Sequence, residues 1–279
     1  MRRVLLLSLI GLSACAAEIP RRIVSMSPNL TEIIYGIGAF DRVVGVSDYC
    51  TYPPAARKLP SVGAWHNPNL EKLAVLHPDL VIVDDGQSAF VADRLDKLRL
   101  PVLVLGLHTI RDVYAAMETL GRALDREADA ARLAASTQEA LRRVSNKTAS
   151  LPKLRVTLIV DRAPGTLRNL NAASERSYLG ELIQLAGGTV AAPPFERGYG
   201  QLSKEELLVT NPDFILDCMH ASGGRFGGDP LEPWQQMPEL KAVKNGRVRS
   251  VNQDFVPHAS QRIVQTAELF ARIIHPEAR

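Results

Sequence analysis

Short apolar runs alternate with helix-like stretches along most of the chain. The runs at 22–26, 43–47, 80–83, 102–105 and 155–160 are rich in valine, leucine and isoleucine, and turn residues or helical patterns separate them. After the first run, Pro28 to Glu32 begin a helix that is expected to end near Gly36 and Gly38. This alternation predicts an α/β fold with mostly parallel sheets.

One stretch of the sequence occurs twice. The segment from Asn69 to Ile82 has a counterpart about 134 positions later, from Ser203 to Leu216. Each copy begins with a helix-capping residue and a carboxylate, continues through a Pro-Asp turn and ends in an apolar strand. A long-period repeat of one supersecondary unit predicts two similar lobes.

Residues 109–152 lie between the repeats, lack a strand pattern and are expected to form a helical connector. Thr109 and Asp112 have the spacing of a capping box, and Asp125 is expected to cap a second helix that runs to about Asn146. Roughly 21 helical residues give a rod of about 30 Å, which is enough to join two lobes. The predicted lobes are therefore 15–108 and 153–279.

A ligand cleft is expected where the two lobes meet. In α/β sheets, ligands bind beyond the carboxyl ends of the strands. Two lobes joined by one helix would line such a cleft with loops from both sheets. A stiff single connector should permit small tilting of the lobes and not wide hinge opening.

The first fifteen residues read as an export signal. Arg2 and Arg3 precede an apolar run, Val4 to Leu12, that is too short to span a bilayer core of ~30 Å. The sequence Leu-Ser-Ala-Cys that ends at Cys15 is similar to the lipobox of bacterial lipoproteins. That resemblance implies removal of residues 1–14, lipidation of Cys15, and a membrane-anchored protein in the periplasm or on the cell surface. The alternative is an ordinary signal peptide that carries a cysteine.

Charge and cysteine content bear on the expected partners and on possible disulfides. Without Arg2 and Arg3 the formal charge of +3 falls to +1, and no basic cluster follows, so nucleic acid is not an expected partner. Cys50 and Cys218 remain after lipidation, and the sequence leaves open whether they are joined or are two free thiols.

Many short segments match a known family in their order and spacing: 22–32, 43–47, 52–54, 62–65, 69–71, 78–82, 186–188, 203–205 and 260–262. On these segments the mature chain resembles the class III substrate-binding proteins of ABC importers, which are helical-backbone receptors for cobalamin, siderophores and haem. Through the run 48–54 and Trp65 it is most similar, within that family, to the cobalamin-binding (vitamin B12) periplasmic proteins. The resemblance implies a monomeric binding protein that is not an enzyme, needs no cofactor and delivers cobalamin or a related corrinoid to a permease dimer with its ATPase.

The closer likeness to cobalamin-binding proteins also implies a set of ligand-binding residues. These are Asn29, Tyr49 and Trp65 in the first lobe and Tyr199, Asp254 and Phe255 in the second. A corrin is a broad apolar ring edged by amides, so flat side chains with a few polar partners suit it. For Trp65 and Tyr199 the alternative is an ordinary half-buried aromatic, and Trp234 is expected to be structural packing.

Two positions depart from the cobalamin-binding pattern. Asp84 and Asn171 stand where those proteins have aromatic residues, which leaves open haem, a ferric siderophore or another metal chelate as the ligand. The pair Asp84-Asp85 is expected to be a solvated strand end, because adjacent side chains point in different directions.

Glu71 and Glu205 stand at equivalent positions of the two repeats. The family resemblance implies that one carboxylate per lobe docks into an arginine pocket on a permease subunit. The alternative is that each carboxylate only complements the dipole of its own helix.

Metal ligation and catalysis are the remaining alternatives. His66, His220 and His258 fall in or next to expected cleft loops and are candidate axial ligands for cobalt or haem iron, or else surface histidines. The chain has no clustered metal-binding spacing, no Gly-x-Ser-x-Gly elbow and no phosphate loop. A metal-chelate-modifying enzyme on the same fold is the less favoured alternative.

Overall fold

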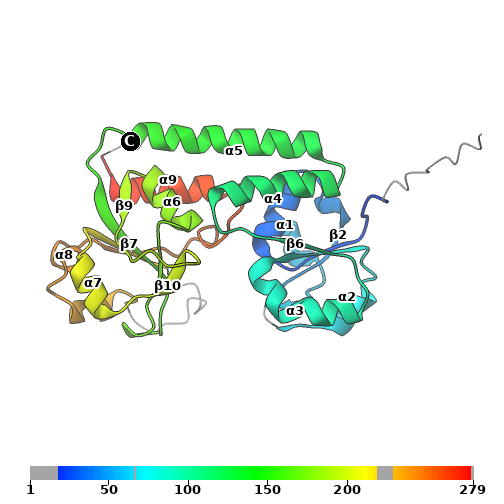
Figure 1. Cartoon of the computed structure of the whole chain (residues 1–279), viewed down its shortest axis with the longest axis horizontal. Coiled ribbons are helices and arrows are strands. Elements are labelled where there is room, and N and C mark those ends of the chain that lie inside the picture. The colour runs from blue at the N-terminus through cyan, green and yellow to red at the C-terminus, as the bar shows by residue number, and fades with distance from the viewer. Residues whose placement is uncertain (1–17, 66, 219–228, 278–279) are drawn as a thin grey trace, which may run out of the picture.

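Two separate sheets form the centre of the protein, one in each half of the chain (Figure 1). The structure is a computed structural model that describes residues 18–65, 67–218 and 229–277. The first sheet is parallel, in the order β2-β1-β5-β6, and the second has the order β10-β8-β7-β11-β12 with β9 also paired to β7. The predicted α/β fold with two lobes is confirmed.

The first sheet comprises β1 (Ile23–Ser25), β2 (Val43–Val46), β5 (Leu80–Asp84) and β6 (Val102–Leu105), and β3 (Gly63–Ala64) pairs with β4 (Asn67–Pro68) in a small ribbon. The second comprises β7 (Leu154–Asp161), β8 (Asn171–Ala173), β9 (Gly188–Val190), β10 (Tyr199–Gln201), β11 (Phe214–Asp217) and β12 (Val248–Ser250). Strand β8 is antiparallel to both of its neighbours, β7 and β10. Strands β9 and β11 each pair in parallel with β7, and β12 pairs in parallel with β11.

Helices cover the faces of both sheets. They are α1 (Pro28–Gly36), α2 (Leu70–Val75), α3 (Asp85–Lys97), α4 (Ile110–Ala123), α5 (Glu127–Thr148), α6 (Tyr178–Leu185), α7 (Lys204–Thr210), α8 (Lys241–Lys244) and α9 (Ile263–Ile274), with 3-10 turns η1 (Phe40–Arg42), η2 (Pro54–Lys58) and η4 (Glu232–Gln236). Within the described residues, none of the helices is long and apolar enough to cross a membrane.

The sequence repeat is also a structural repeat. Asn69 accepts a hydrogen bond from the backbone of Lys72 at 2.9 Å, and Ser203 accepts one from Glu206 at 3.1 Å, so both predicted caps are confirmed. After α2 and α7 the chain turns through a left-handed residue, His77 or Asn211. These turns bring the chain back to the sheet at the same point in both lobes.

The aspartate of each Pro-Asp turn then fixes the start of a central strand. Asp79 exchanges two hydrogen bonds with the backbone of Arg22, both 2.9 Å long. Asp213 makes the same pair of bonds to Arg155, both 2.8 Å long. Strands β1 and β7 are thus held to the neighbouring repeat segments in the same way, which explains why the Pro-Asp turn occurs in both lobes.

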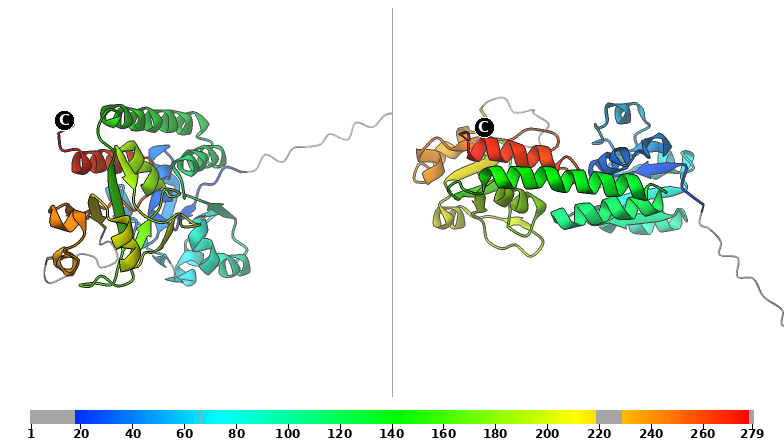
Figure 2. Two further views of the ribbon diagram at one scale, coloured as in Figure 1. Left: turned by 60° about the vertical axis from the view of Figure 1, so that its left-hand side comes forward. Right: turned by 90° about the horizontal axis from the view of Figure 1, so that it is seen from above.

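Helix α5 runs along one side of the molecule and extends over both lobes, while α4 lies beside it at the first lobe and α9 at the second (Figures 1 and 2). Its 22 residues correspond to a rod of about 33 Å. The Thr109–Asp112 capping box of α4 is confirmed. The expected Asp125 cap is wrong: Asp125 adopts a left-handed conformation (φ 53°) in the turn between the helices, and Arg126 occupies the cap position of α5.

A second connection between the lobes is formed by side chains. Glu32 on α1 is buried, and its carboxylate accepts hydrogen bonds from His258 Nδ1 at 2.8 Å, Arg262 Nη1 at 2.9 Å and the Ser260 hydroxyl. Gln261 adds a bond of 2.8 Å to the backbone carbonyl of Glu32. The segment that leads into α9 therefore clamps the first lobe, and we call these five residues the Glu32 clamp.

Two cysteines and a hydrogen-bonded tryptophan, aspartate and arginine lie in the protein interior. Cys50 and Cys218 are buried free thiols, so no disulfide joins them, and burial raises the pKa of both. Trp234 is fully buried and donates to Asp217 at 2.7 Å, beside the ion pair of Asp217 with Arg162 at 2.9 Å. This confirms the structural role expected for Trp234.

We expect Glu32→Gln to lower the free energy of unfolding by about 3 kcal/mol, because it leaves Arg262 beside a neutral group in a buried site. Urea unfolding measures this change. The matched control is Glu118→Gln, which removes an exposed pair with Arg122 on α4 and should cost less than about 1 kcal/mol. Equal losses at the two positions would contradict a buried clamp.

Candidate functional site

A hollow of about 270 Å³ lies where the carboxyl ends of the two sheets face each other. Its walls come from both lobes: Asp84, Leu107 and His108 from the first, and Val160, Tyr178, Leu179, Tyr199 and Pro257 from the second. This is the position that the topology predicts for a ligand. The volume is just below the usual range for small-molecule pockets.

The first wall of the hollow contains one carboxylate, that of Asp84. Asp84 ends β5 and caps α3 by accepting a bond from the backbone of Gly86 at 3.0 Å. Asp85 points elsewhere, to His108 Nε2 at 2.6 Å. Burial, and secondarily the neighbouring Asp85, raises the pKa of Asp84. The expectation of a solvated strand end is therefore wrong for Asp84, which is half-buried and lines the hollow.

Two tyrosines form the opposite wall. The backbone N–H of Tyr178 donates to the carbonyl of His108 at 2.7 Å, which ties the lobes together at the base of the hollow, and its hydroxyl donates to Val256 at 3.1 Å. Tyr199 lines the hollow while its hydroxyl is buried, and burial raises the pKa of this hydroxyl.

The predicted ligand-binding residues lie at different places relative to the hollow. Tyr199 lines it directly. Trp65 is half-buried and is not among the lining residues: its ring lies against Gly86 and 5.8 Å from the ring of Phe90 on α3, and its carbonyl accepts a bond of 2.7 Å from Gln87. Asn29, in the first turn of α1, and Tyr49, exposed in the loop after β2, are not among the residues that line the hollow.

Asp254 and Phe255 lie in the second lobe near the Glu32 clamp. Arg262 donates to Asp254 at 3.0 Å, and its guanidinium lies 5.3 Å from the Phe255 ring and 4.5 Å from the Tyr52 ring of the first lobe. Both predicted residues therefore contact the arginine that bridges the lobes.

The histidine predictions have different outcomes. His66 and His220 lie outside the described residues, as does Cys15. His258 is not a surface histidine without a partner, because its Nδ1 is bound to Glu32 in the clamp. In the described ranges, no group of three histidine, cysteine or acidic residues could hold a metal ion.

His108 and Tyr178 belong to the site but were missed in the sequence. His108 follows the strand 102–105 by three residues, so the rule that places ligands beyond strand ends could have identified it. Tyr178 gave no comparable signal, because its contact with His108 depends on how the lobes meet.

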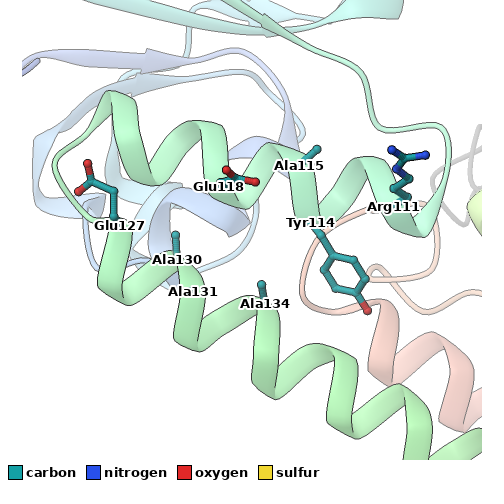
Figure 3. Close-up of a pocket in the computed structure, with 8 residues that line it drawn as sticks. All are labelled: Arg111, Tyr114, Ala115, Glu118, Glu127, Ala130, Ala131 and Ala134. Atoms are coloured by element: carbon teal, nitrogen blue, oxygen red, sulfur yellow. The ribbon is translucent and has the colours of Figure 1, made fainter.

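A larger hollow, of about 500 Å³, lies between α4 and α5 (Figure 3). Alanines form its base, and its other lining residues are Arg111, Tyr114, Glu118 and Glu127. Small side chains between two packed helices leave such a groove. It belongs to the connector, and none of the predicted ligand-binding residues lines it.

Glu71 and Glu205 are exposed in the first turns of α2 and α7. In α7 the capping box is completed by Glu206, whose carboxylate accepts a bond of 2.8 Å from the backbone of Ser203. Within the described residues, neither Glu71 nor Glu205 makes an ion pair. Both carboxylates are thus free to contact another molecule while still lying at helix N-termini.

Comparison with known proteins adds independent information. A family model described as "Periplasmic binding protein" matches residues 23–254. An uncharacterized ABC transporter substrate-binding lipoprotein of Bacillus subtilis is 28% identical and aligns over 92% of this chain and 81% of its own. A vitamin B12-binding protein of Pectobacterium carotovorum is 26% identical over 93% and 91% of the two chains. The crystal structure of a periplasmic heme-binding protein from Pseudomonas aeruginosa has the same fold, with a TM-score of 0.81 at 22% identity over 93% and 94%.

We expect Asp84→Asn to stabilise the protein at neutral pH. Because its folded-state pKa is raised, ionisation of Asp84 costs folding free energy above the ordinary carboxyl pKa of 3.8. Asparagine keeps an oxygen that can cap α3 but carries no charge. Thermal unfolding across a pH series should show a higher melting temperature for the variant at pH 7, with a gain that shrinks toward pH 3.8 and disappears below it. A gain that is constant with pH would contradict this account.

Proposed function

This chain belongs to the periplasmic binding protein family, and on that premise we propose that it binds cobalamin or a related corrinoid and delivers it to an ABC importer. It acts outside the cytoplasm, held at a membrane through a lipidated Cys15, and it carries its ligand unchanged. The lipoprotein name of the Bacillus subtilis relative and the vitamin B12-binding name of the Pectobacterium relative support the two parts of this proposal.

The observation that carries the proposal is the composition of the inter-lobe hollow. Tyr199 lines the hollow from the second lobe, and Trp65, whose ring lies against Gly86 at the start of α3, offers a second flat apolar surface on the first lobe. Asp84 offers carboxylate oxygen atoms that accept hydrogen bonds, which suits the amide N–H groups around a corrin ring. A neutral amide-edged ring thus fits beside Asp84 better than a ligand with carboxylates of its own.

Haem is the second candidate, and the geometry of His258 favours it. Histidines that bind metals usually donate their other N–H to a carboxylate. Nδ1 of His258 lies 2.8 Å from the Glu32 carboxylate, and a ring that donates there from Nδ1 would have Nε2 to offer as a ligand. Against haem, its propionates would face Asp84 in the hollow, where like charges repel.

Delivery requires contact with a permease, which we assign to Glu71 and Glu205. Their equivalent positions in α2 and α7 suit a partner made of two related subunits. Docking of both lobes at once would allow the permease to separate them and release the ligand.

Calorimetric titration of cobalamin into the purified Cys15→Ser protein, with haem in parallel, tests the ligand. We expect saturable one-to-one cobalamin binding that Trp65→Ala weakens about tenfold, because an aromatic contact is worth about 1 kcal/mol or slightly more. Tyr114→Ala, in the hollow between α4 and α5, is the control and should leave the affinity unchanged. Binding of haem but not cobalamin, abolished by His258→Ala, would replace the corrinoid by haem.

The docking assignment predicts a separation of binding from delivery. Glu71→Ala combined with Glu205→Ala should leave ligand affinity unchanged and abolish stimulation of the transporter ATPase. Glu118→Ala with Glu139→Ala removes two exposed carboxylates from α4 and α5 and serves as the charge-matched control. Normal stimulation by the first double variant would exclude these glutamates as the docking residues.

A further inference from the structure

Val75 and Val209 are the two most exposed large apolar side chains among the described residues, at 74% and 85%. They also occupy the same position in the two repeats, six residues after the caps Asn69 and Ser203. The next most exposed, Tyr49, reaches 55% and has no repeat partner of this kind. Single exposed apolar side chains are common on protein surfaces, and what distinguishes these two is that the repeat places them at equivalent sites.

Each valine shares a helix face with one of the exposed glutamates. Val75 follows Glu71 by four residues in α2, and Val209 follows Glu205 by four residues in α7. Side chains at positions i and i+4 of a helix are neighbours. Each lobe therefore presents a carboxylate next to an apolar side chain, and we call each such combination a Glu-Val pair.

The Glu-Val pair is what the two lobes have in common on this surface. The exposed lysines, Lys72 and Lys204, occupy non-equivalent positions beside the glutamates, and Leu208 is exposed (39%) where α2 has Ala74. The backbone around each pair is the same in both lobes, with a left-handed residue and a strand-binding aspartate after each helix. The repeat thus preserves one charge and one apolar contact in one geometry.

The two pairs are positioned for a single large partner. Figures 1 and 2 show α2 and α7 in different lobes, both on the side of the molecule away from α5. A partner that meets both must span the two lobes and must offer two equivalent sites. A two-fold pair of subunits has this property.

We propose that the Glu71–Val75 and Glu205–Val209 pairs form a two-part docking surface for a two-fold pair of permease subunits. Each subunit supplies a basic side chain for the glutamate and an apolar pocket for the valine. This inference rests on the proposed function and extends it. Exposed ion pairs alone contribute little because water and salt screen them. The valines exclude water beside the glutamates and add apolar contact area, which is how a small interface gains affinity.

Cross-linking in the source cells tests the surface without reference to the ligand. The full-length lipidated protein carries the photo-cross-linker p-benzoylphenylalanine in place of Val75, Val209 or, as control, Val104, which is 46% exposed on β6. We expect positions 75 and 209 to cross-link to the same polytopic permease, identified by peptide sequencing, and position 104 to give no such product. Cross-links from only one of the two positions, from all three equally, or only to other proteins would overturn the proposal.

Transport measurements give a second, quantitative test. Val75→Ser with Val209→Ser should leave the affinity for cobalamin unchanged and reduce the initial rate of labelled cobalamin uptake about tenfold or more. Val102→Ser with Val104→Ser makes the same chemical change on β6 and should alter uptake less than about twofold.

The two tests separate failure of the docking surface from failure of the proposed function. Normal uptake by the Val75 and Val209 double variant would overturn the docking surface and leave corrinoid delivery intact. Absence of cobalamin binding and uptake in the native protein would overturn corrinoid delivery, and the cross-linking pattern would still decide the docking surface.

Discussion

The buried carboxylate of Glu32 holds the two lobes of this protein in one arrangement. A charge in the protein interior is stable only when several donors satisfy it, and here His258, Ser260 and Arg262 all do so from the other lobe. Because losing these bonds would leave charges unpaired, the clamp resists separation of the lobes. The position of the cleft, and the distance between its two walls, follow from this constraint.

Other contacts reinforce the same geometry. The His108 carbonyl receives the N–H of Tyr178 at 2.7 Å, and the carboxylate of Glu181 on α6 accepts the N–H of Ile110 at 2.6 Å. Together with α5, these bonds give the lobes three kinds of connection near the base of the cleft.

The sequence repeat also builds the same strand and helix arrangement in both lobes. Asp79 and Asp213 fix β1 and β7 in the same way, so α2 and α7 leave their sheets at equivalent points. The cleft itself is not symmetric, because Asp84 stands on one wall and Tyr199 on the other. Each lobe therefore presents the same kind of surface to the proposed two-fold partner. Residues that differ between the lobes line the site that we assign to an asymmetric ligand.

The sequence by itself determined the features that depend on neighbouring residues. Alternating apolar runs, the caps at Asn69, Thr109 and Ser203, and the repeated Pro-Asp turn were all predicted correctly, because each acts within a few residues of its own position. The capping prediction was wrong at Asp125, because this residue is left-handed in the turn between α4 and α5. The cap position of α5 is therefore the next residue, Arg126.

Only the tertiary structure decided the contacts between distant segments. Asp84 became a wall of the cleft, and His258 became a partner of Glu32 more than two hundred residues away. No periodicity or spacing encodes such a contact, since it depends on the angle at which two lobes meet. The same is true of the two Glu-Val pairs: the sequence shows that they repeat, and the fold shows that both valines stay exposed, on helices α2 and α7 that lie on the same side of the molecule.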